Sequence, residues 1–193
     1  MTGTPGTGKT TATDRLDTDL DVVHLNRVVE AEGLTAGTDE RRGSWIADVD
    51  AIEAWLDGRD DVVVESHLAH LFDADRVVVL RCRPVVLEAR LLDRGESAAK
   101  ARENAEAEAL DVLLAEAVER HGEERVYEID TTGRSPESVA ADIAAVLTGD
   151  REPSVGTVSF ISYLEGEEDA RDDGQVGDGG TSPETATGAG DSS

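Results

Sequence analysis

The stretch Gly3-Thr4-Pro5-Gly6-Thr7-Gly8-Lys9-Thr10-Thr11 decides the fold. It matches the pattern G-x-x-x-x-G-K-[ST] of a phosphate-binding loop (P-loop), which joins a strand to a helix. Glycines allow such a loop to turn several backbone N–H groups towards an anion, and the N-terminus of the following helix attracts the same negative charge. The stretch therefore predicts a binding site for a nucleoside triphosphate.

Side chains of the loop have separate expected roles. Three glycines shape its backbone: Gly3, Gly6 and Gly8. Lys9 is expected to bring a positive charge to the β- and γ-phosphates, and the Thr10 hydroxyl to help hold Mg²⁺. Lys9 is one of only two lysines in the chain, the other being Lys100, and a helix-compatible stretch follows at 10–16. Both observations argue against a chance match.

Only Met1 and Thr2 precede the loop, whereas a P-loop normally follows a buried parallel strand of about five residues. Either the chain starts several apolar residues earlier, or the sheet lacks its usual central strand. We favour the earlier start, because a sheet without its middle strand would leave backbone groups of two neighbouring strands unpaired.

The 193 residues include 43 acidic and 18 basic side chains, which gives a formal net charge of −25. The length suits one domain with a core. The electrostatic field of so many negative charges repels nucleic acid, so no strong direct nucleic-acid binding is expected. Acid enrichment with few lysines resembles proteins of salt-loving archaea, where salt screens self-repulsion. No apolar run is long enough to span a membrane, and Cys82 is the single cysteine; we expect a cytoplasmic protein.

Short apolar runs predict the strands of a parallel sheet with helices between them, an α/β fold. The runs are 21–24, 61–65, 77–81 and 126–129. Helical patterns cover 26–31, 50–56, 84–94, 97–120 as one or two helices, and 135–147. The polar, glycine-punctuated segment 33–44 predicts a loop. Its Arg41 and Arg42 could clamp a second phosphate group, or simply face solvent.

Ligands of open α/β sheets bind at the carboxyl ends of the strands, where Glu65 is expected. Glu65 is predicted to hold the water shell of Mg²⁺ or to orient the attacking group; the alternative is a cap on the next helix. His67 follows two residues later and is expected to reach the same cleft, although a lone histidine is as often structural. His70 has no third ligand nearby, so a metal pair with His67 is not expected.

Arg90 and Arg94 are four residues apart in a predicted helix, so both guanidinium groups project from one face. Two convergent arginines neutralise the charge that develops on a phosphoryl group during transfer. Ion pairing with neighbours such as Glu96 is the alternative. The loop 130–135 after the last strand could pack against a base.

The composition changes after Asp150. The segment 155–164 keeps enough apolar residues to dock on the domain or on a partner, so 150–164 is interpreted as an extension of a domain formed by 1–149. From Glu165 onward the chain consists mainly of Asp, Glu, Gly, Ser and Thr. Such a segment has little to bury, and we predict a disordered acidic tail over 165–193.

Four segments resemble the small adenylate kinases of archaea and of the eukaryotic nucleus, which are P-loop nucleoside monophosphate kinases also linked to maturation of the small ribosomal subunit. They are GTPGTGKTT (3–11), VVVESH (62–67), VVVLRCRP (77–84) and ARLLDRG (89–95). The resemblance covers nearly all of 1–149. It implies a parallel sheet flanked by helices with two insertions, a monophosphate-binding region at about 24–47 and a short lid at about 93–103.

By this resemblance, five loop residues bind the ATP phosphates: Gly6, Gly8, Lys9, Thr10 and Thr11. Arg94 matches the lid arginine. Glu65-Ser66-His67 matches a second motif of an acid, a spacer and a histidine, with Glu where some members carry Asp. The family implies phosphoryl transfer from Mg·ATP to AMP, giving two ADP. It also implies a role in 16S rRNA maturation, with a ribosomal protein of the small-subunit platform and the pre-ribosome as partners.

Two other functions stay open. An assembly factor would use ATP binding and slow hydrolysis to switch its grip on a ribosomal partner, with His67 orienting water and 155–164 contacting the partner. A kinase of another small metabolite would use the same donor site with a different acceptor. The residues do not decide which monophosphate is preferred.

Overall fold

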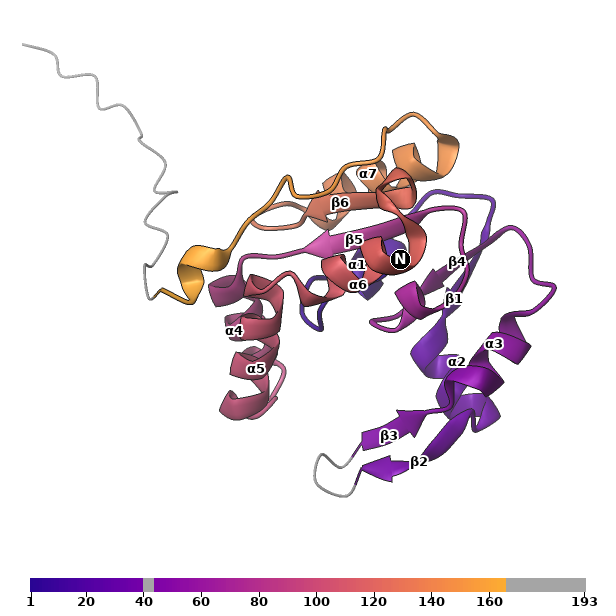
Figure 1. The fold of residues 1–193 in the computed structure, drawn as a ribbon, viewed down its shortest axis with the longest axis horizontal. Helices are drawn as coiled ribbons and strands as arrows, with labels where there is room; N and C mark the ends of the chain where they lie inside the picture. Colours follow the sequence, from indigo (N-terminus) through magenta and orange to yellow (C-terminus); the bar gives the residue numbers. More distant parts are fainter. Residues whose placement is uncertain (40–43, 166–193) are drawn as a thin grey trace, which may run out of the picture.

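The computed structural model describes residues 1–39 and 44–165 (Figure 1). The strands are β1 (Asp21–His24), β2 (Thr35–Asp39), β3 (Ser44–Ala47), β4 (Val62–Glu65), β5 (Val77–Arg81) and β6 (Val126–Asp130). The helices are α1 (Lys9–Thr13), α2 (Leu25–Glu32), α3 (Val49–Leu56), α4 (Pro84–Asp93), α5 (Ala98–Ala109), α6 (Val112–His121) and α7 (Pro136–Thr148). Three short 3-10 turns are η1 (Ala69–Leu71), η2 (Glu123–Arg125) and η3 (Ile161–Tyr163).

The main sheet consists of two parallel pairs, β1 with β4 and β5 with β6, joined by the first two residues. The N–H of Thr2 donates to Val78 O at 2.8 Å, and the N–H of Leu80 donates to Thr2 O at 3.0 Å. On the other side, the N–H of Ser66 donates to Met1 O at 3.3 Å. Met1 and Thr2 thus occupy the central position of the sheet, and the P-loop leaves from there.

Most predicted elements are confirmed, including the α/β class and all four strand runs. The segment 97–120 forms two helices, α5 and α6, because Asp111 between them adopts a left-handed conformation with φ of 56°. The helix after β1 begins at Leu25 with His24 as its N-cap residue, one residue before the predicted start. The helix after the P-loop is shorter than the predicted 10–16 and ends at Thr13.

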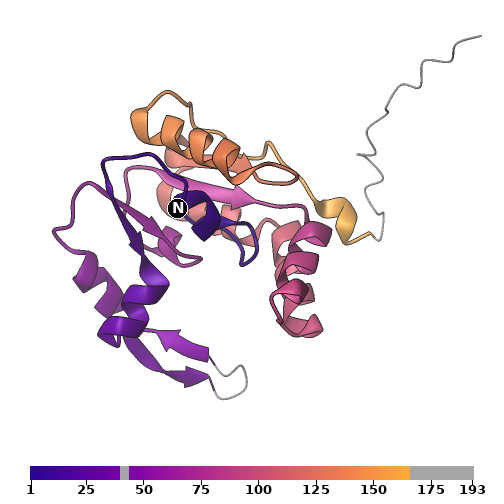
Figure 2. The same cartoon turned by 180° about the vertical axis from the view of Figure 1, so that it is seen from behind.

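The prediction of a loop over 33–44 is wrong for its described part. β2 and β3 pair in antiparallel fashion, with Thr38 opposite Trp45 and a register irregularity near Gly37. Two antiparallel strands can be joined by a short connection. The hydrogen bonds between their backbones therefore stabilise this hairpin, although its polar sequence lacks the regular alternation typical of strands. The hairpin projects away from the main sheet beside α2 and α3 (Figure 2). Arg41 and Arg42 lie outside the described residues.

Helices cover both faces of the β5–β6 pair. Val78, Leu80 and Ile129 pack on one face against a group from α1 and α7: Ala12, Val139, Ile143 and Val146. Val77, Val79 and Val126 pack on the other face against Leu114 and Ala117 of α6. Successive residues of each strand therefore pack against helices on opposite faces of the sheet. This packing holds the carboxyl ends of the strands next to the P-loop.

The segment after α7 lies along β6. The N–H of Ser154 donates to Val126 O at 3.0 Å, and the N–H of Glu128 donates to Ser154 O at 2.8 Å. Farther along, the Tyr163 hydroxyl donates to Glu88 Oε2 of α4 at 2.9 Å. These bonds fix the described part of the extension to the domain; 166–193, the bulk of the predicted tail, lies outside the described residues.

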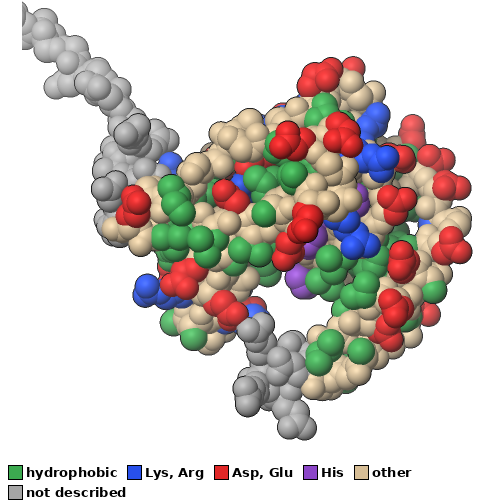
Figure 3. Space-filling model, viewed as in Figure 1, with side chains coloured by type: hydrophobic (Ala, Val, Ile, Leu, Met, Phe, Trp, Pro, Cys, Tyr) green, Lys and Arg blue, Asp and Glu red, His purple; other side chains and the backbone are tan. Residues whose placement is uncertain are grey.

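Acidic side chains are spread over the face drawn in Figure 3, whereas Lys and Arg are fewer. This distribution agrees with the net charge of −25. None of the described helices is both long enough and apolar enough to cross a membrane.

Candidate functional site

The P-loop lies tightly against β5 and α4. Gly3 and Gly6 have φ values of 145° and 102°, which disfavour any residue with a side chain. A Cβ atom at Gly3 would lie 2.5 Å from Leu80 O, and one at Gly6 would lie 3.0 Å from Leu87 Cγ. The short distance at Gly3 excludes a side chain there, and at Gly6 the positive φ and the tight contact with Leu87 both favour glycine.

The side chain of Lys9 folds back over its own loop. Its Nζ donates to Gly3 O at 2.7 Å and to Thr4 O at 3.2 Å. Burial lowers the pKa of Lys9 to about 8, although the carboxylates of Glu65 and Glu108 favour the charged amine. The amine therefore lies inside the curve of the loop, and its role towards phosphates stays a prediction of the motif.

The carboxylate of Glu65 connects three elements. The Thr10 hydroxyl on α1 donates to Glu65 Oε1 at 3.3 Å, and His24 Nδ1, at the end of β1, lies 2.9 Å from Glu65 Oε2. Glu65 is 6% exposed. His24 Nε2 also lies 3.8 Å from Asp14 Oδ1, so the imidazole bridges two carboxylates. The alternative role of Glu65 as a cap on the following helix is not observed, because its described partners are Thr10 and His24.

The hydroxyl and carboxylate oxygens of Thr10 and Glu65 are the ligand type that Mg²⁺ prefers, and they lie side by side at the loop, so they fit this ion. Over 1–39 and 44–165, no group of three or more His, Cys, Asp or Glu side chains is arranged to hold a metal ion by itself. A magnesium ion here would complete its shell with nucleotide phosphates and water, as Mg²⁺ commonly does.

His67 follows β4 on the side of the sheet covered by α6. Burial lowers its pKa, and the positive charge of Lys9 lowers it further, so the imidazole is neutral at pH 7. The ring lines a hollow of about 550 Å³ together with Leu71, Leu113 and Glu116. His70 is structural: its Nδ1 lies 3.1 Å from Thr2 Oγ1 and its Nε2 3.0 Å from Glu116 Oε2.

Arg90 and Arg94 reach the P-loop from α4. Arg90 Nη1 donates to Gly6 O at 3.2 Å, and Arg94 Nε donates to Arg90 O at 3.3 Å. The alternative pairing with Glu96 is not made, because Glu96 binds Lys100 at 2.9 Å. Arg94 also lies near Gly6, because a Cβ atom at Gly6 would be 3.4 Å from Arg94 Nη2. Both arginines therefore border the loop, and their role in phosphoryl transfer stays a prediction.

These elements enclose a pocket of about 380 Å³. Its walls come from the P-loop, α1, α4, the segment after β6 and the start of α7: Gly6, Thr7, Gly8, Thr11, Ala12, Arg90, Asp93, Arg94, Thr131, Arg134, Pro136 and Val139. The Thr131 hydroxyl donates to Thr7 O at 2.9 Å and to Arg81 O at 2.8 Å, which ties this segment to the loop. The loop predicted to pack against a base thus forms one wall of the pocket.

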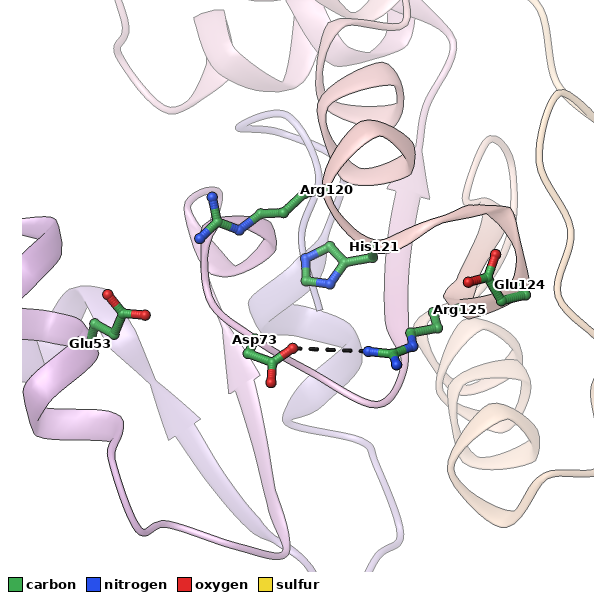
Figure 4. Close-up of a pocket in the computed structure, with 6 residues that line it drawn as sticks. All are labelled: Glu53, Asp73, Arg120, His121, Glu124 and Arg125. Carbon is green, nitrogen blue, oxygen red and sulfur yellow. Dashed lines mark ion pairs between the residues drawn. The ribbon is translucent and has the colours of Figure 1, made fainter.

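A third hollow, of about 450 Å³, lies between α3 and the end of α6 (Figure 4). Its lining is Glu53, Asp73, Arg120, His121, Glu124 and Arg125. Arg125 Nη1 lies 3.9 Å from Asp73 Oδ1. Charges of both signs share this hollow, and it contains none of the predicted site residues, so we assign it no part in phosphate binding.

Sequence reasoning missed two residues that touch the site. His24 ends a predicted strand, as Glu65 does, and comparing the ends of both strands would have found it. Glu108 of α5 accepts a hydrogen bond from Thr4 of the P-loop. Glu108 lies in a segment rich in Ala and Glu, so no local signal distinguishes it from solvated neighbours.

Known proteins resemble this chain over most of its length. A family model described as an AAA domain matches residues 1–111. Relatives carrying the name "Putative adenylate kinase" include one from Natronomonas pharaonis, 65% identical over 85% of this chain and 98% of its own length. Another is from Halobacterium salinarum, 64% identical over 85% of this chain and 98% of its own length. A third, from Methanothermobacter thermautotrophicus, is 45% identical over 86% of this chain and 98% of its own length. The chain belongs to this archaeal family of P-loop adenylate kinases, which are phosphotransferases.

Proposed function

We propose that this protein transfers the γ-phosphoryl group of Mg·ATP to AMP and releases two ADP. One observation supports this most: Lys9, the Thr10–Glu65 pair and the Arg90–Arg94 pair all border the same loop, although they come from three separate parts of the chain. A lysine, a metal-binding oxygen pair and convergent arginines are the parts that phosphoryl transfer requires.

The donor nucleotide is proposed to bind with its phosphates on the P-loop and its base in the pocket of about 380 Å³. Backbone amides shaped by the loop glycines bind the phosphates, assisted by Lys9 and by the Thr11 hydroxyl. Mg²⁺ screens the charge of the phosphates when bound. Thr10 and Glu65 hold its inner or outer shell, and His24 fixes the orientation of the carboxylate.

The transferring group is proposed to meet Arg90 and Arg94, whose charges oppose the negative charge that develops there. The acceptor would enter between the P-loop and the predicted monophosphate-binding region, which contains α2 and the β2–β3 hairpin. Closure of the predicted lid, at about 93–103, over the nucleotides would exclude water, so that transfer outcompetes hydrolysis.

Slow ATP hydrolysis is a second proposed activity, in which His67, two residues after Glu65 and close enough to Lys9 to be influenced by its charge, would orient the attacking water. A neutral imidazole accepts a hydrogen bond, which is what orienting an attacking water requires. If this activity predominates, the protein is the ATP-driven assembly factor to which the family resemblance also points. Ile161 and Leu164 of the extension are 51% and 40% exposed and offer apolar surface to a protein partner.

ADP formation by the purified protein in high salt separates these activities. ATP alone is compared with ATP plus AMP, with AMP labelled so that the origin of each ADP is known. The kinase predicts strong stimulation by AMP and label in half of the ADP. Slow hydrolysis that ignores AMP, CMP and GMP would exclude the kinase and favour the assembly factor.

A further inference from the structure

A buried cluster of charges lies behind the P-loop, centred on Arg81 at the end of β5. Arg81 is 1% exposed. Its Nε donates to Glu108 Oε1 of α5 at 2.8 Å, and its Nη1 donates to Glu128 Oε1 of β6 at 2.5 Å. Its Nη2 donates to Asp111 and to the backbone carbonyl of Glu108. Every guanidinium nitrogen of Arg81 thus has a partner inside the protein.

Glu108 connects this cluster to the P-loop. Its Oε1 also accepts from the N–H of Cys82 at 3.1 Å, while its Oε2 accepts from the hydroxyl of Thr4. Thr4 belongs to the loop, and its carbonyl accepts from Lys9 Nζ at 3.2 Å. A single carboxylate on α5 is therefore bonded to the residue whose carbonyl positions the P-loop lysine.

The extension after α7 closes the cluster from the opposite side. Glu128 Oε2 accepts from the N–H of Thr157 at 2.7 Å, from its hydroxyl at 2.8 Å and from the N–H of Val158 at 3.3 Å. The ring of Phe160 lies 5.4 Å from Arg81 Cζ and is 6% exposed. The side chains that surround Arg81 therefore extend continuously from the extension to the P-loop.

Burying the Arg81 guanidinium with the carboxylates of Glu108 and Glu128 costs free energy, and apolar residues of similar volume often stabilise a protein equally well. The third carboxylate, that of Asp111, is 41% exposed. This cluster instead supplies a directional bond to a loop whose backbone must hold a fixed shape before phosphate arrives. Within the loop, Thr4 O also accepts from the N–H of Thr7 at 3.2 Å and from its hydroxyl at 2.9 Å. The carboxylate of Glu108 is the contact that ties this turn to the rest of the protein through the Thr4 side chain.

We propose that Glu108 is a positioning residue for ATP: held by Arg81 and the Cys82 amide, it fixes Thr4 and thereby the phosphate-binding conformation of the loop and Lys9. The proposal deepens the proposed function, because it takes this loop as the ATP site. Glu108 lies at the end of α5, and α5 begins within the predicted lid. The same bond therefore links the lid to the loop.

The Thr4 hydroxyl provides the sharpest test, because its removal leaves the buried charges in place. Thr4→Val deletes the bond to Glu108 with little change in volume, and Thr4→Ser keeps it. Thr13→Val is the matched control: Thr13 is also buried, but its hydroxyl donates only to carbonyls of its own helix, Lys9 O and Thr10 O. Calorimetry gives the Kd for Mg·ATP, the kinase assay gives KM for ATP and for AMP, and circular dichroism gives Tm.

We expect Thr4→Val to raise the Kd and KM for ATP about tenfold, the size expected for losing a hydrogen bond to a charged group. In Thr4→Val, KM for AMP should change less than about twofold. Thr4→Ser should bind ATP as tightly as the wild type, and so should Thr13→Val. A purely structural role would instead lower Tm and leave the affinities of correctly folded protein unchanged.

An unchanged Kd in Thr4→Val, or no recovery in Thr4→Ser, would overturn the positioning role. Failure of the proposed kinase has a different signature. Tight ATP binding without stimulation by AMP would reject the kinase, whereas the Kd values of the Thr4 variants would still decide the role of Glu108. A wild-type protein that binds no ATP would overturn both.

Discussion

His24 Nδ1 lies 2.9 Å from Glu65 Oε2, at the carboxyl ends of two paired strands. The parallel register of β1 and β4 places these residues directly opposite each other. Because the other oxygen of the carboxylate accepts from Thr10, both oxygens of Glu65 have defined partners. A carboxylate held in this way keeps one orientation towards an ion at the loop. Replacing it by an amide of the same shape therefore tests the effect of its charge alone.

Glu65→Gln removes that charge and keeps the size of the side chain. We expect kcat to fall by about 10²- to 10³-fold, the usual cost of losing one preorganised electrostatic group. The Mg²⁺ concentration for half-maximal rate should rise as well, because the amide is a weaker ligand for this hard cation. Titrating Mg²⁺ in a coupled ADP assay measures both quantities.

Glu116→Gln is the matched control for this charge. Glu116 also contacts a histidine, with Oε2 3.0 Å from His70 Nε2, but it lies on α6 outside the phosphate site. Its kcat and Mg²⁺ dependence should match the wild type. An unaltered Mg²⁺ titration in Glu65→Gln would remove Glu65 from the proposed metal site.

Lys9→Ala should reduce kcat/KM by about 10³-fold or more, since several kcal/mol of transition-state stabilisation are lost with a buried charge aimed at the phosphates. Lys100→Ala provides the control, because Lys100 is the other lysine and pairs with Glu96 on the protein surface. Steady-state kinetics with both nucleotides measures the effect. Near-normal turnover of Lys9→Ala would refute this site assignment.

The affinity for ATP should fall as the pH rises above 8. Burial lowers the pKa of Lys9 to about 8 in the free protein, so the amine loses its charge above that pH. Bound phosphates favour the charged amine and raise its pKa, so binding above pH 8 must take up a proton, whereas binding at pH 7 does not. Each pH unit above 8 is then expected to weaken binding by up to about tenfold.

Calorimetry at pH 7 and pH 9, in pairs of buffers with different ionisation enthalpies, counts the protons taken up. The variant Lys9→Arg should bind without this uptake, since a guanidinium keeps its charge over the whole range. Equal proton uptake by wild type and Lys9→Arg at pH 9 would show that another group titrates.

Arg90→Ala should lower kcat by about 10²- to 10³-fold, because the guanidinium beside Gly6 O is proposed to oppose charge on the transferring group. Arg102→Ala is the control, which tests whether the loss of any arginine from this region lowers kcat. Arg102 pairs with Glu106 at 2.9 Å on the exposed side of α5, and its loss should leave kcat within about twofold of the wild type. Similar kinetics for the two variants would contradict the proposed role of Arg90.

The parts of this protein that the sequence predicts well are those with a local cause. The loop motif requires glycine geometry over nine residues, and the Val-rich runs require burial on both faces, so loop and strands are evident from short windows. The β2–β3 hairpin was missed because its stability comes from cross-strand pairing rather than from alternation within either strand. Glu108 was missed for a related reason: its partner Thr4 lies 104 residues away.

The extension offers a last prediction, on stability rather than activity. The Oγ atom of Ser154 is buried without a hydrogen-bond partner among the described residues, where the backbone of Ser154 pairs with β6. An unsatisfied buried hydroxyl costs about 1–3 kcal/mol, so Ser154→Ala should leave the free energy of unfolding unchanged or raise it by about 1 kcal/mol. Thr157→Val should lower it by about 1–2 kcal/mol instead, because it removes a bond to the Glu128 carboxylate. Denaturant unfolding at fixed salt measures both, and a loss of stability in Ser154→Ala would show that its hydroxyl has a partner in solution.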